Sequence, residues 1–552
     1  MKDDRQKYLS ERRGSLQRER SSFEAHWKDL SQYILPRKGR FFVSDRNKGE
    51  KRHQSIINSR GTQALRTCVS GMLAGTMSPT RPWFNLEPQN EDLMENQQVK
   101  LWLHKTEQKM RSILNEGNFY AMAPTFLSEL ICFGTGAMAH VEDFEDVARF
   151  YTHTVGSYYI GQNERFEVDT ILRQFDWSVR QLVNEFGLNN VPQNVKECYN
   201  EGHYDQWHTV YHLVEPNNKF IVDSSFSTNM PFVSVYWMYG TKEAKGDPVI
   251  LRERGYEEFP VHVARWDVTG EDIYGTDCPG MTALGDIRSL QSGEKTKAQG
   301  VQKMVHPPLH GPATVKNVPV SQLPGGLTVY DSSSEQRLEP LLKIQLPINE
   351  LRQDMDSVEN RINSAFFVDL FLAISTMEGI QPRNQLDLMQ RNEERLLQLG
   401  PVLERLQGEF LDPLINRLFN QGIRAGIFGE PPKELVDQDL KIKYISTLAM
   451  AQKAVATQSL ERTLQFAGAL AQLGYQDALK KIDAAQMIDE HAKATGVTPT
   501  VIIPDEVLEE QKRQEQEMAA QQQQLIMAEQ AANVGKTAAE GLVSAQELED
   551  AG

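Results

Sequence analysis

Apolar residues recur at helical spacing through most of the first 133 residues. Leucine or phenylalanine returns at every seventh position from Leu9 to Leu30, which predicts an amphipathic helix over residues 6–35 that Pro36 ends. The same spacing predicts three more helices in this part of the chain, at 55–77, 94–115 and 121–133. The beginning of the chain is therefore expected to be helical.

Alternation of apolar and polar residues replaces this spacing after Gly134. The alternation is clearest in Phe166–Leu172, and strands are expected to dominate residues 137–266. One helix interrupts them, because Ser178 is a suitable N-cap for Val179–Phe186. This block predicts an α+β unit, and the whole chain is expected to be α+β and predominantly helical.

Two further helices are expected on either side of a proline-rich segment. Residues 281–305 have helical spacing, whereas three prolines within residues 306–312 exclude a helix there. Pro347 suits the first turn of a second helix. Its apolar residues follow a heptad pattern and form a narrow seam, which consists of Ile348, Leu351, Met355, Val358 and Ile362. The seam could pack on the 281–305 helix, on a neighbouring subunit, or as an ordinary core-facing helix.

The C-terminal third begins with an expected loop. Residues 370–385 contain Gly379 and Pro382 and are predicted to be exposed. A long helix should follow, with a kink expected at Gly400–Pro401 and a second bend near Gly408 and Pro413. Residues beyond these are rich in alanine, leucine and glutamine, and from Val507 the glutamine-rich composition favours either a helix or disorder.

Length and composition restrict the class of protein. The chain has 552 residues, too many for one compact core, so about three or four substructures are expected. Its four cysteines are far apart, which excludes a disulfide scaffold and suits a reducing compartment. The first residues lack the apolar core of a signal peptide, and no apolar run approaches the roughly 20 residues of a membrane span. A soluble protein is expected.

The net charge of −16 is unevenly distributed. Residues 1–60 carry 16 basic and 8 acidic residues, whereas the tail from Asp505 carries 3 basic and 11 acidic residues. The simplest explanation of this uneven charge is that both ends of the chain have charged, solvent-exposed faces. The alternative is a protein that lets DNA pass without holding it, because an acidic wall repels phosphate.

Sequence motifs of enzymes are absent or misplaced. There is no phosphate loop of the G-x-x-x-x-G-K-[ST] type and no zinc-peptidase or hydrolase motif. Gly134–Ala139 matches G-x-G-x-x-A, but helical spacing precedes it and strand-like sequence follows, the reverse of a dinucleotide site. We therefore interpret Gly134 as a helix stop. His306 and His310 lack a nearby third ligand, so no metal or cofactor is predicted.

The order of these segments, with three stretches of sequence, carries a family resemblance. The stretches are Arg60–Leu65 with Gly71–Gly75 and Pro82–Phe84, Leu130–Gly136 with Gly156–Ile160, and Arg391–Phe410 with Pro413–Leu414. The chain resembles the portal, or head-to-tail connector, proteins of tailed bacteriophages, most closely those of short-tailed phages. The resemblance implies a ring of twelve copies at one capsid vertex, with wing, stem, clip and crown regions, through which DNA is packaged and later ejected.

The resemblance also divides the chain into regions. It implies a wing at 1–280, stem helices at 281–305 and 347–368, a clip at 306–346, a channel loop at 369–385, a kinked wing helix at 386–430, a crown at 431–510 and a glutamine-rich tail at 511–552, helical or disordered. The candidate DNA-channel residues are Ser375, Thr376, Met377, Glu378, Arg383, Lys295, Lys297 and Lys303. The heptad seam is the candidate for stem and subunit packing. The clip candidates for docking terminase or tail are His306, Pro307, Pro308, His310 and Pro312.

The implied partners are further copies of the chain, double-stranded DNA, the terminase, a tail adaptor, and capsid and scaffolding proteins. No membrane partner and no enzymatic activity are expected. The implied location is the capsid vertex of the virion, and the host cytoplasm during assembly. The alternatives are another adaptor or scaffold ring of the virion or, with less support, a nucleotide-dependent enzyme.

Overall fold

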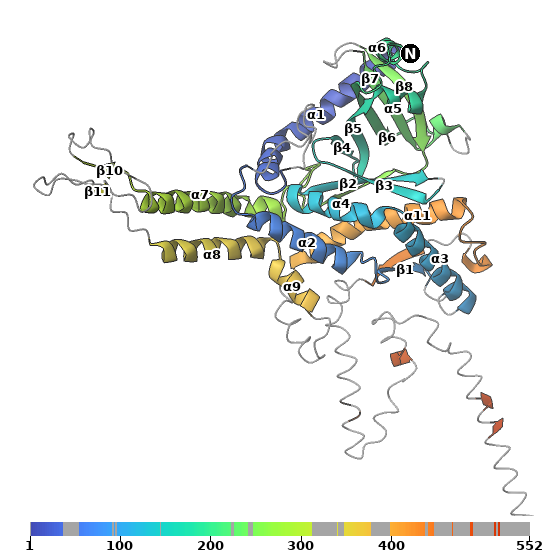
Figure 1. The fold of residues 1–552 in the computed structure, drawn as a ribbon. Coiled ribbons are helices and arrows are strands. Elements are labelled where there is room, and N and C mark those ends of the chain that lie inside the picture. The colour runs from blue at the N-terminus through green and yellow to red at the C-terminus, as the bar shows by residue number, and fades with distance from the viewer. Residues whose placement is uncertain are drawn as a thin grey trace, which may run out of the picture. The chain divides into compact units, whose positions relative to one another are not determined.

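The computed structural model is shown in Figure 1. It describes residues 2–36, 54–90, 93, 96–143, 145–221, 226–240, 247–311, 339–340, 347–376, 398–435, 440–445, 466, 468, 486–488, 513–514 and 517–518. The described chain forms two compact units: the larger holds residues up to 83 and 108–429, and the smaller holds 84–107 and 430–445. Helices and strands are mixed, with helix predominating, as the sequence predicts.

The helices predicted near the start of the chain are present. They are α1 (Lys2–Tyr33), α2 (Arg60–Thr76), α3 (Gln97–Glu116) and α4 (Phe119–Phe133). Leu9, Leu16 and Leu30 are buried, so the seven-residue repeat does mark the packed face of α1. The predicted N-cap is confirmed as well: Ser178 and Gln181 form a reciprocal capping box at the start of α5 (Val179–Phe186).

A five-stranded antiparallel sheet follows in the order β4-β5-β6-β7-β8. Its strands are β4 (Tyr158–Gln162), β5 (Val168–Ser178), β6 (Trp207–Pro216), β7 (Phe232–Tyr239) and β8 (Pro248–Tyr256). Helix α1 lies across one face, and α5 and α6 (Gln193–Asn200) cover the other (Figure 1). We call α1, the five strands, α5 and α6 the sheet sandwich.

Each face of this sheet has its own apolar core. Leu9 and Leu16 of α1 pack with Leu213 and Trp237 on one face. On the other face Val179 and Leu182 of α5 join a second cluster of strand residues. The alternation of side chains along each strand supplies both cores at once, which is why the strand sequences are apolar on both faces near the centre.

The basic residues of α1 are used within the sheet sandwich. Arg12 forms an ion pair with Glu215 at 3.2 Å, and Arg5 forms one with Glu253 at 3.0 Å. Arg13 lies over the Tyr211 ring, and the buried Arg20 donates to the Gly156 and Tyr158 carbonyls. Much of the positive charge of this helix therefore fastens it to the sheet.

A second, three-stranded sheet runs in the order β3 (Val147–His153), β2 (Thr135–Asp143), β9 (Val261–Arg265). Helix α4 ends at Phe133, and Gly134 follows in the left-handed conformation with a φ of 78°. Strand β2 begins at Thr135, so a helix precedes the glycine motif and a strand follows it, as the sequence predicts. Gly134 is thus a helix stop of the usual kind.

The smaller unit is built on a two-stranded antiparallel sheet of β1 (Phe84–Pro88) and β12 (Leu440–Tyr444). The Leu86 amide donates to Glu107 Oε1 at 2.7 Å on the side away from β12, and Lys443 forms an ion pair with Glu87 at 2.8 Å. No helix in the described parts of the chain has the length and apolar character needed to cross a membrane.

Candidate functional site: a two-helix hairpin with an extended tip

Helices α7 (Pro279–Val305) and α8 (Ile348–Ala365) lie side by side (Figure 1). At their far end β10 (Leu309–His310) pairs antiparallel with β11 (Glu339–Pro340), with Leu309 opposite Pro340. We call these four elements the α7–α8 hairpin. The two helices expected from the sequence are therefore present, and α7 begins with a proline in its first turn.

The heptad seam of α8 packs partly within its own chain. Met355, Val358 and Ile362 are buried and Leu351 is half-buried. A Cβ placed on Gly293 of α7 would lie 3.8 Å from the Met355 side chain, so the two helices are close at this point. Within the chain, the seam therefore packs on α7. Ile348, the remaining seam residue, is the first residue of α8.

Burial along α7 stops halfway. Its buried residues all lie at or before Gln291, and no later side chain of the helix is buried. Val301, Met304 and Val305 are 39%, 40% and 65% exposed. Their i, i+3, i+4 spacing places them on one side of the helix. We call these three residues the distal ridge; it is an apolar surface that the described chain does not cover.

Polar contacts fix the other end of the hairpin. Gln291 accepts from the Ile57 and Asn58 amides at 2.7 and 2.8 Å and donates to the Asn58 carbonyl at 2.8 Å. The Asn58 side chain donates to Glu359 of α8 at 3.0 Å. Both helices are thus tied to the segment that precedes α2.

Ion pairs add to this attachment. Arg361 of α8 pairs with Asp286 of α7 at 2.9 Å, and Arg288 of α7 pairs with Asp29 of α1 at 2.6 Å. These groups are partly exposed, so water and salt screen each pair and it contributes little by itself. Together with the Gln291 contacts they give the base of the hairpin a defined position.

The expected loop at 369–385 is wrong over its first eight residues. Helix α9 spans Val368–Thr376, after a break at Phe367, whose φ is 54°. Leu370 and Phe371 are buried. A Cβ on Gly71 of α2 would lie 2.2 Å from Phe371 Cγ, so the ring packs directly on the glycine backbone. This contact buries one side of the segment, and a helical conformation places the apolar side chains on that side.

The candidate loop residues are only partly placed by the structure. The backbones of Ser375 and Thr376 form the end of α9. Met377, Glu378 and Arg383 lie outside the described residues. The structure thus brings the start of the proposed channel loop against α2, through Phe371 and Gly71.

The predicted long helix departs from regular α-helix later than expected. Residues 398–406 are continuously helical through Gly400 and Pro401. A wide π-helical turn follows at Gln407–Leu411, and α11 (Asp412–Arg424) continues from it. Such turns change the direction in which side chains point. Here the turn contains Gly408, the second of the predicted bend positions, and Glu409.

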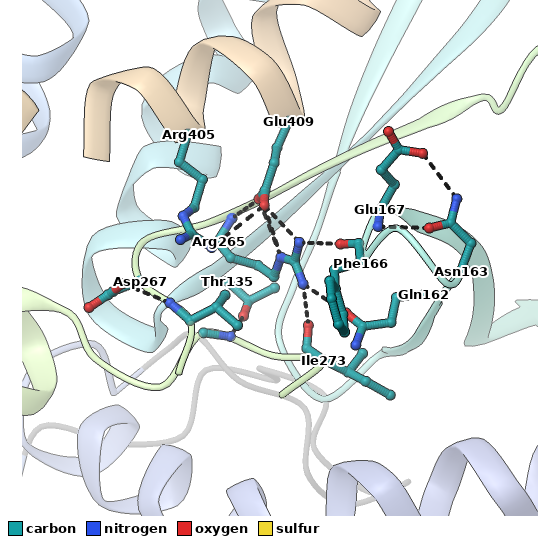
Figure 2. Close-up of polar contacts among 12 residues, drawn as sticks. Thr135, Gln162, Asn163, Phe166, Glu167, Arg265, Asp267, Ile273, Arg405 and Glu409 are labelled. Carbon is teal, nitrogen blue, oxygen red and sulfur yellow. Dashed lines mark hydrogen bonds and ion pairs between the residues drawn. The ribbon is translucent and has the colours of Figure 1, made fainter. Parts of the chain in front are cut away.

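Glu409 of this turn contacts Arg265 at the end of β9, as Figure 2 shows. Its carboxylate accepts from the Arg265 side chain at 2.7 Å and from the Arg265 amide at 2.8 Å. Arg265 is buried and also donates to the Phe166 carbonyl and to Gln162. A bidentate, charge-assisted contact of this kind is among the stronger polar contacts in proteins. The sequence offered no signal for it, because the partners are 144 positions apart.

The three candidate lysines of α7 have different surroundings. Lys297 forms an ion pair with Glu294 at 2.6 Å. Lys303 is exposed in the last turn, where a positive charge stabilises the helix dipole. Lys295 is exposed and has no ion pair with any described residue. Lys295 and Lys303 are therefore the two lysines whose charges are available to a phosphate.

The clip candidates are at the tip of the hairpin. His306, Pro308 and His310 are exposed and Pro307 is half-buried, whereas Pro312 lies outside the described residues. Within the parts of the chain that are described, no three histidine, cysteine, aspartate or glutamate side chains form a metal-binding group. The tip is thus a protruding surface of prolines and histidines.

Buried histidines lie between the three-stranded sheet and α11. His140 Nδ1 and His262 Nε2 are 3.3 Å apart, and Arg417 of α11 donates to the His140 carbonyl. Burial, with the nearby Arg417 charge, lowers the pKa of His262 to about 3 and also lowers the pKa of His140. Both histidines are buried, so they form part of the packing between the three-stranded sheet and α11.

The sequence matches the model of the family described as "Bacteriophage head to tail connecting protein" over residues 6–503. The chain belongs to this family. It is 40% identical to the portal protein of Salmonella phage epsilon15 over 528 residues, which covers 95% of this chain and 94% of that protein. It is 39% identical over 500 residues to a probable portal protein of Bordetella phage BPP-1, covering 90% and 89%.

These similarities confirm the resemblance to portal proteins that the sequence features suggest. The family is one of structural connectors between phage head and tail, and a connector needs a surface that meets other chains. On the α7–α8 hairpin the distal ridge and the tip are exposed, while polar contacts hold the base.

Proposed function

We propose that twelve copies of this connector close into a ring at one capsid vertex. Double-stranded DNA enters the capsid through its central channel during packaging and leaves through it at ejection. In this proposal the α7–α8 hairpins form the stem of the channel wall. The tip and the residues between β10 and β11 form the clip, and residues 1–280 and 386–430 form the wing.

The observation that carries the proposal is the distal ridge. Val301, Met304 and Val305 expose an apolar stripe on the otherwise polar second half of α7. Burying one such side chain contributes about 1.5–3 kcal/mol, so covering the stripe favours association with a neighbouring copy. Identical copies that contact head to tail close into a ring when the rotation permits it. The heptad seam holds α8 against α7 within each copy, so the mostly polar outer sides of the hairpin remain for contacts with a neighbouring copy.

The charge of the chain supports a conduit. A net charge of −16 repels phosphate on average, so DNA can slide without being held. The proposed channel residues are Lys295, Lys303, Lys297, Ser375, Thr376, Met377, Glu378 and Arg383. Among the lysines we expect Lys295 and Lys303 to contribute more than Lys297, because Glu294 already neutralises Lys297.

The remaining assignments rest on the family. We infer that the clip, with His306, Pro307, Pro308, His310 and Pro312, docks the terminase during packaging in the host cytoplasm and a tail adaptor afterwards. Residues 431–510 are proposed to form the crown toward the capsid interior, with the glutamine-rich 511–552 beyond it. Capsid and scaffolding proteins would meet the wing in the finished virion.

Native mass spectrometry of the purified full chain tests the proposal. We expect a dominant species of twelve copies, with neighbouring copy numbers as minor species. A protein that stays at one or two copies across a wide concentration range would contradict the ring.

A further inference from the structure

A row of stacked cationic and aromatic side chains crosses the five-stranded sheet. Arg173 of β5 is paired with His212 of β6, His212 with Tyr236 of β7, and Tyr236 with Arg252 of β8. Directly paired residues point to the same face of a sheet. The His212 and Tyr236 rings stack at 3.8 Å with 6° between their planes, and the Arg252 guanidinium lies 4.9 Å from the Tyr236 ring centre.

Negative charge balances only one end of this row. Arg252 forms an ion pair with Glu185 at 2.7 Å. Arg173 has no carboxylate partner among the described residues and lies over the Phe175 ring at 4.8 Å. Burial lowers the pKa of Arg173, and three tyrosines, Tyr151, Tyr236 and Tyr256, lie near its guanidinium. A secluded guanidinium without an anion is unfavourable, because it has lost water without gaining a counter-charge.

Two buried histidines beside Arg173 have unused nitrogens. His212 shares a hydrogen bond with Ser234 through Nε2 at 2.9 Å, while its Nδ1 is buried and has no partner among the described residues. His153 of β3 has a buried Nε2 without a partner in the same part of the chain. The two side chains are 5% and 4% exposed. Both histidines are near the guanidinium, because His212 is the cross-strand partner of Arg173 and the His153 ring centre lies 6.4 Å from that of Tyr158, the β4 residue that is paired with Arg173. Burial, followed by the Arg173 charge, lowers the pKa of both histidines.

Solvent reaches this cluster from one side. Tyr151 of β3 is 47% exposed, and Tyr256 at the end of β8 and Arg173 itself are half-buried. Arg173 and two of the tyrosines therefore reach solvent, whereas the two histidine nitrogens are buried.

We propose that Arg173, His153 and His212, together with the tyrosine hydroxyls, form an oxyanion-binding site. Guanidinium, imidazole and phenol groups are all hydrogen-bond donors to phosphate, sulfate or carboxylate oxygens. The oxyanion could be a free ion such as phosphate, or a carboxylate of a neighbouring copy in this acidic protein. The second source rests on the proposed ring, and the first does not.

The first arm of the test titrates inorganic phosphate, and separately sulfate, against chloride at constant ionic strength. The midpoint of thermal unfolding is measured for the full chain. A saturable rise of several degrees is expected for a bound ion. Arg173→Gln should weaken the apparent affinity at least about 10-fold, whereas Arg180→Gln, an exposed arginine on α5, should leave it unchanged. If Arg173→Gln does not fold, Tyr151→Phe, at the exposed mouth of the site, replaces it.

The second arm measures ring dissociation on dilution by mass photometry, in chloride. A carboxylate from a neighbouring copy predicts no phosphate effect on the wild type and at least about 10-fold easier dissociation of Arg173→Gln or Tyr151→Phe rings. The Arg180→Gln ring should match the wild type. The site is refuted if neither phosphate nor sulfate stabilises the protein and ring dissociation is the same in all variants. Failure of the wild type to form rings would count against the proposed function alone, since the first arm would still decide the site.

Discussion

The sheet sandwich and the α7–α8 hairpin bury their apolar residues in different ways. In the sandwich, α1 covers one face of the sheet and α5 and α6 the other, so Trp237 and Leu213 are completely buried within one chain. In the hairpin, burial on α7 ends at Gln291 and the distal ridge faces solvent. The comparison teaches that one region is complete as a single chain, whereas the other leaves apolar surface that the proposed ring would cover.

The largest effect is expected from charging the distal ridge. Val301→Asp with Met304→Asp should abolish ring formation, because two carboxylates would have to be buried at each contact between copies. The protomer itself should unfold at nearly the same denaturant concentration, since both positions are exposed in the chain. Mass photometry and chemical denaturation measure the two quantities.

A matched control sharpens this result. Leu188 is 36% exposed in the sandwich, so Leu188→Asp adds a charge at a similarly exposed apolar position. We expect its rings to form normally. If the ridge variant assembled as well as this control, the ridge would not be the contact between copies.

A deep substitution in the sandwich should have the opposite pattern. Trp237→Ala removes a fully buried ring that stacks on Tyr211, and should cost about 3–5 kcal/mol of protomer stability. Rings that do assemble should keep the wild-type copy number. Denaturant unfolding of the protomer checks the first statement, and an altered copy number would show that the two regions are not independent.

Acid should destabilise the body of the protein through its buried histidines. The folded-state pKa of His262 is lowered to about 3 and that of His140 is also lowered. The unfolded chain therefore binds more protons below pH 6.5, and stability should fall as the pH drops toward 4, by up to about 1.4 kcal/mol per pH unit for each histidine. Unfolding free energies at pH 4.5–7.5 test this; an unchanged slope in His262→Gln would contradict it.

The contact of α9 with α2 should be sensitive to one methyl group. Gly71→Ala would place a Cβ against the Phe371 ring and should cost about 1–3 kcal/mol. The double variant with Phe371→Leu should recover part of this loss. A Gly71→Ala protein as stable as the wild type would show that the ring can move aside freely.

The smallest effect concerns the stem lysines. Lys295→Gln should reduce the salt dependence of DNA retention by packaged particles, by about one unit in the slope per contacting lysine. Lys297→Gln should change it less, because Glu294 already pairs with Lys297. Equal effects of the two substitutions would remove the proposed distinction between them.

Local patterns in the sequence predicted much of this fold. The heptad of α1, the N-cap at Ser178 and the heptad of α8 depend on residues close in sequence, and each is present. The helical start of the expected loop was missed because it depends on Phe371 meeting Gly71, 300 positions earlier. The sequence predicted a bend near Gly408 but not a π-helical turn, because Glu409 meets its partner Arg265 only in the tertiary fold.

The candidate site shows the same limit. Sequence spacing identified the seam on α8 and the prolines of the tip. It did not identify the distal ridge. Val301, Met304 and Val305 stand out only in the structure, where the buried part of α7 ends before them. The basic residues at the start of the chain also had several possible roles. The contacts of Arg12, Arg13 and Arg20 show that part of this charge holds α1 on the sheet.

Electron cryomicroscopy of the assembled protein tests the central claim most directly. The account predicts a twelve-fold ring with a central hole, in which the α7–α8 hairpins stand side by side around the channel and each distal ridge is covered by the neighbouring copy. A ring in which the hairpins point outward, with the ridge in solvent, would contradict it.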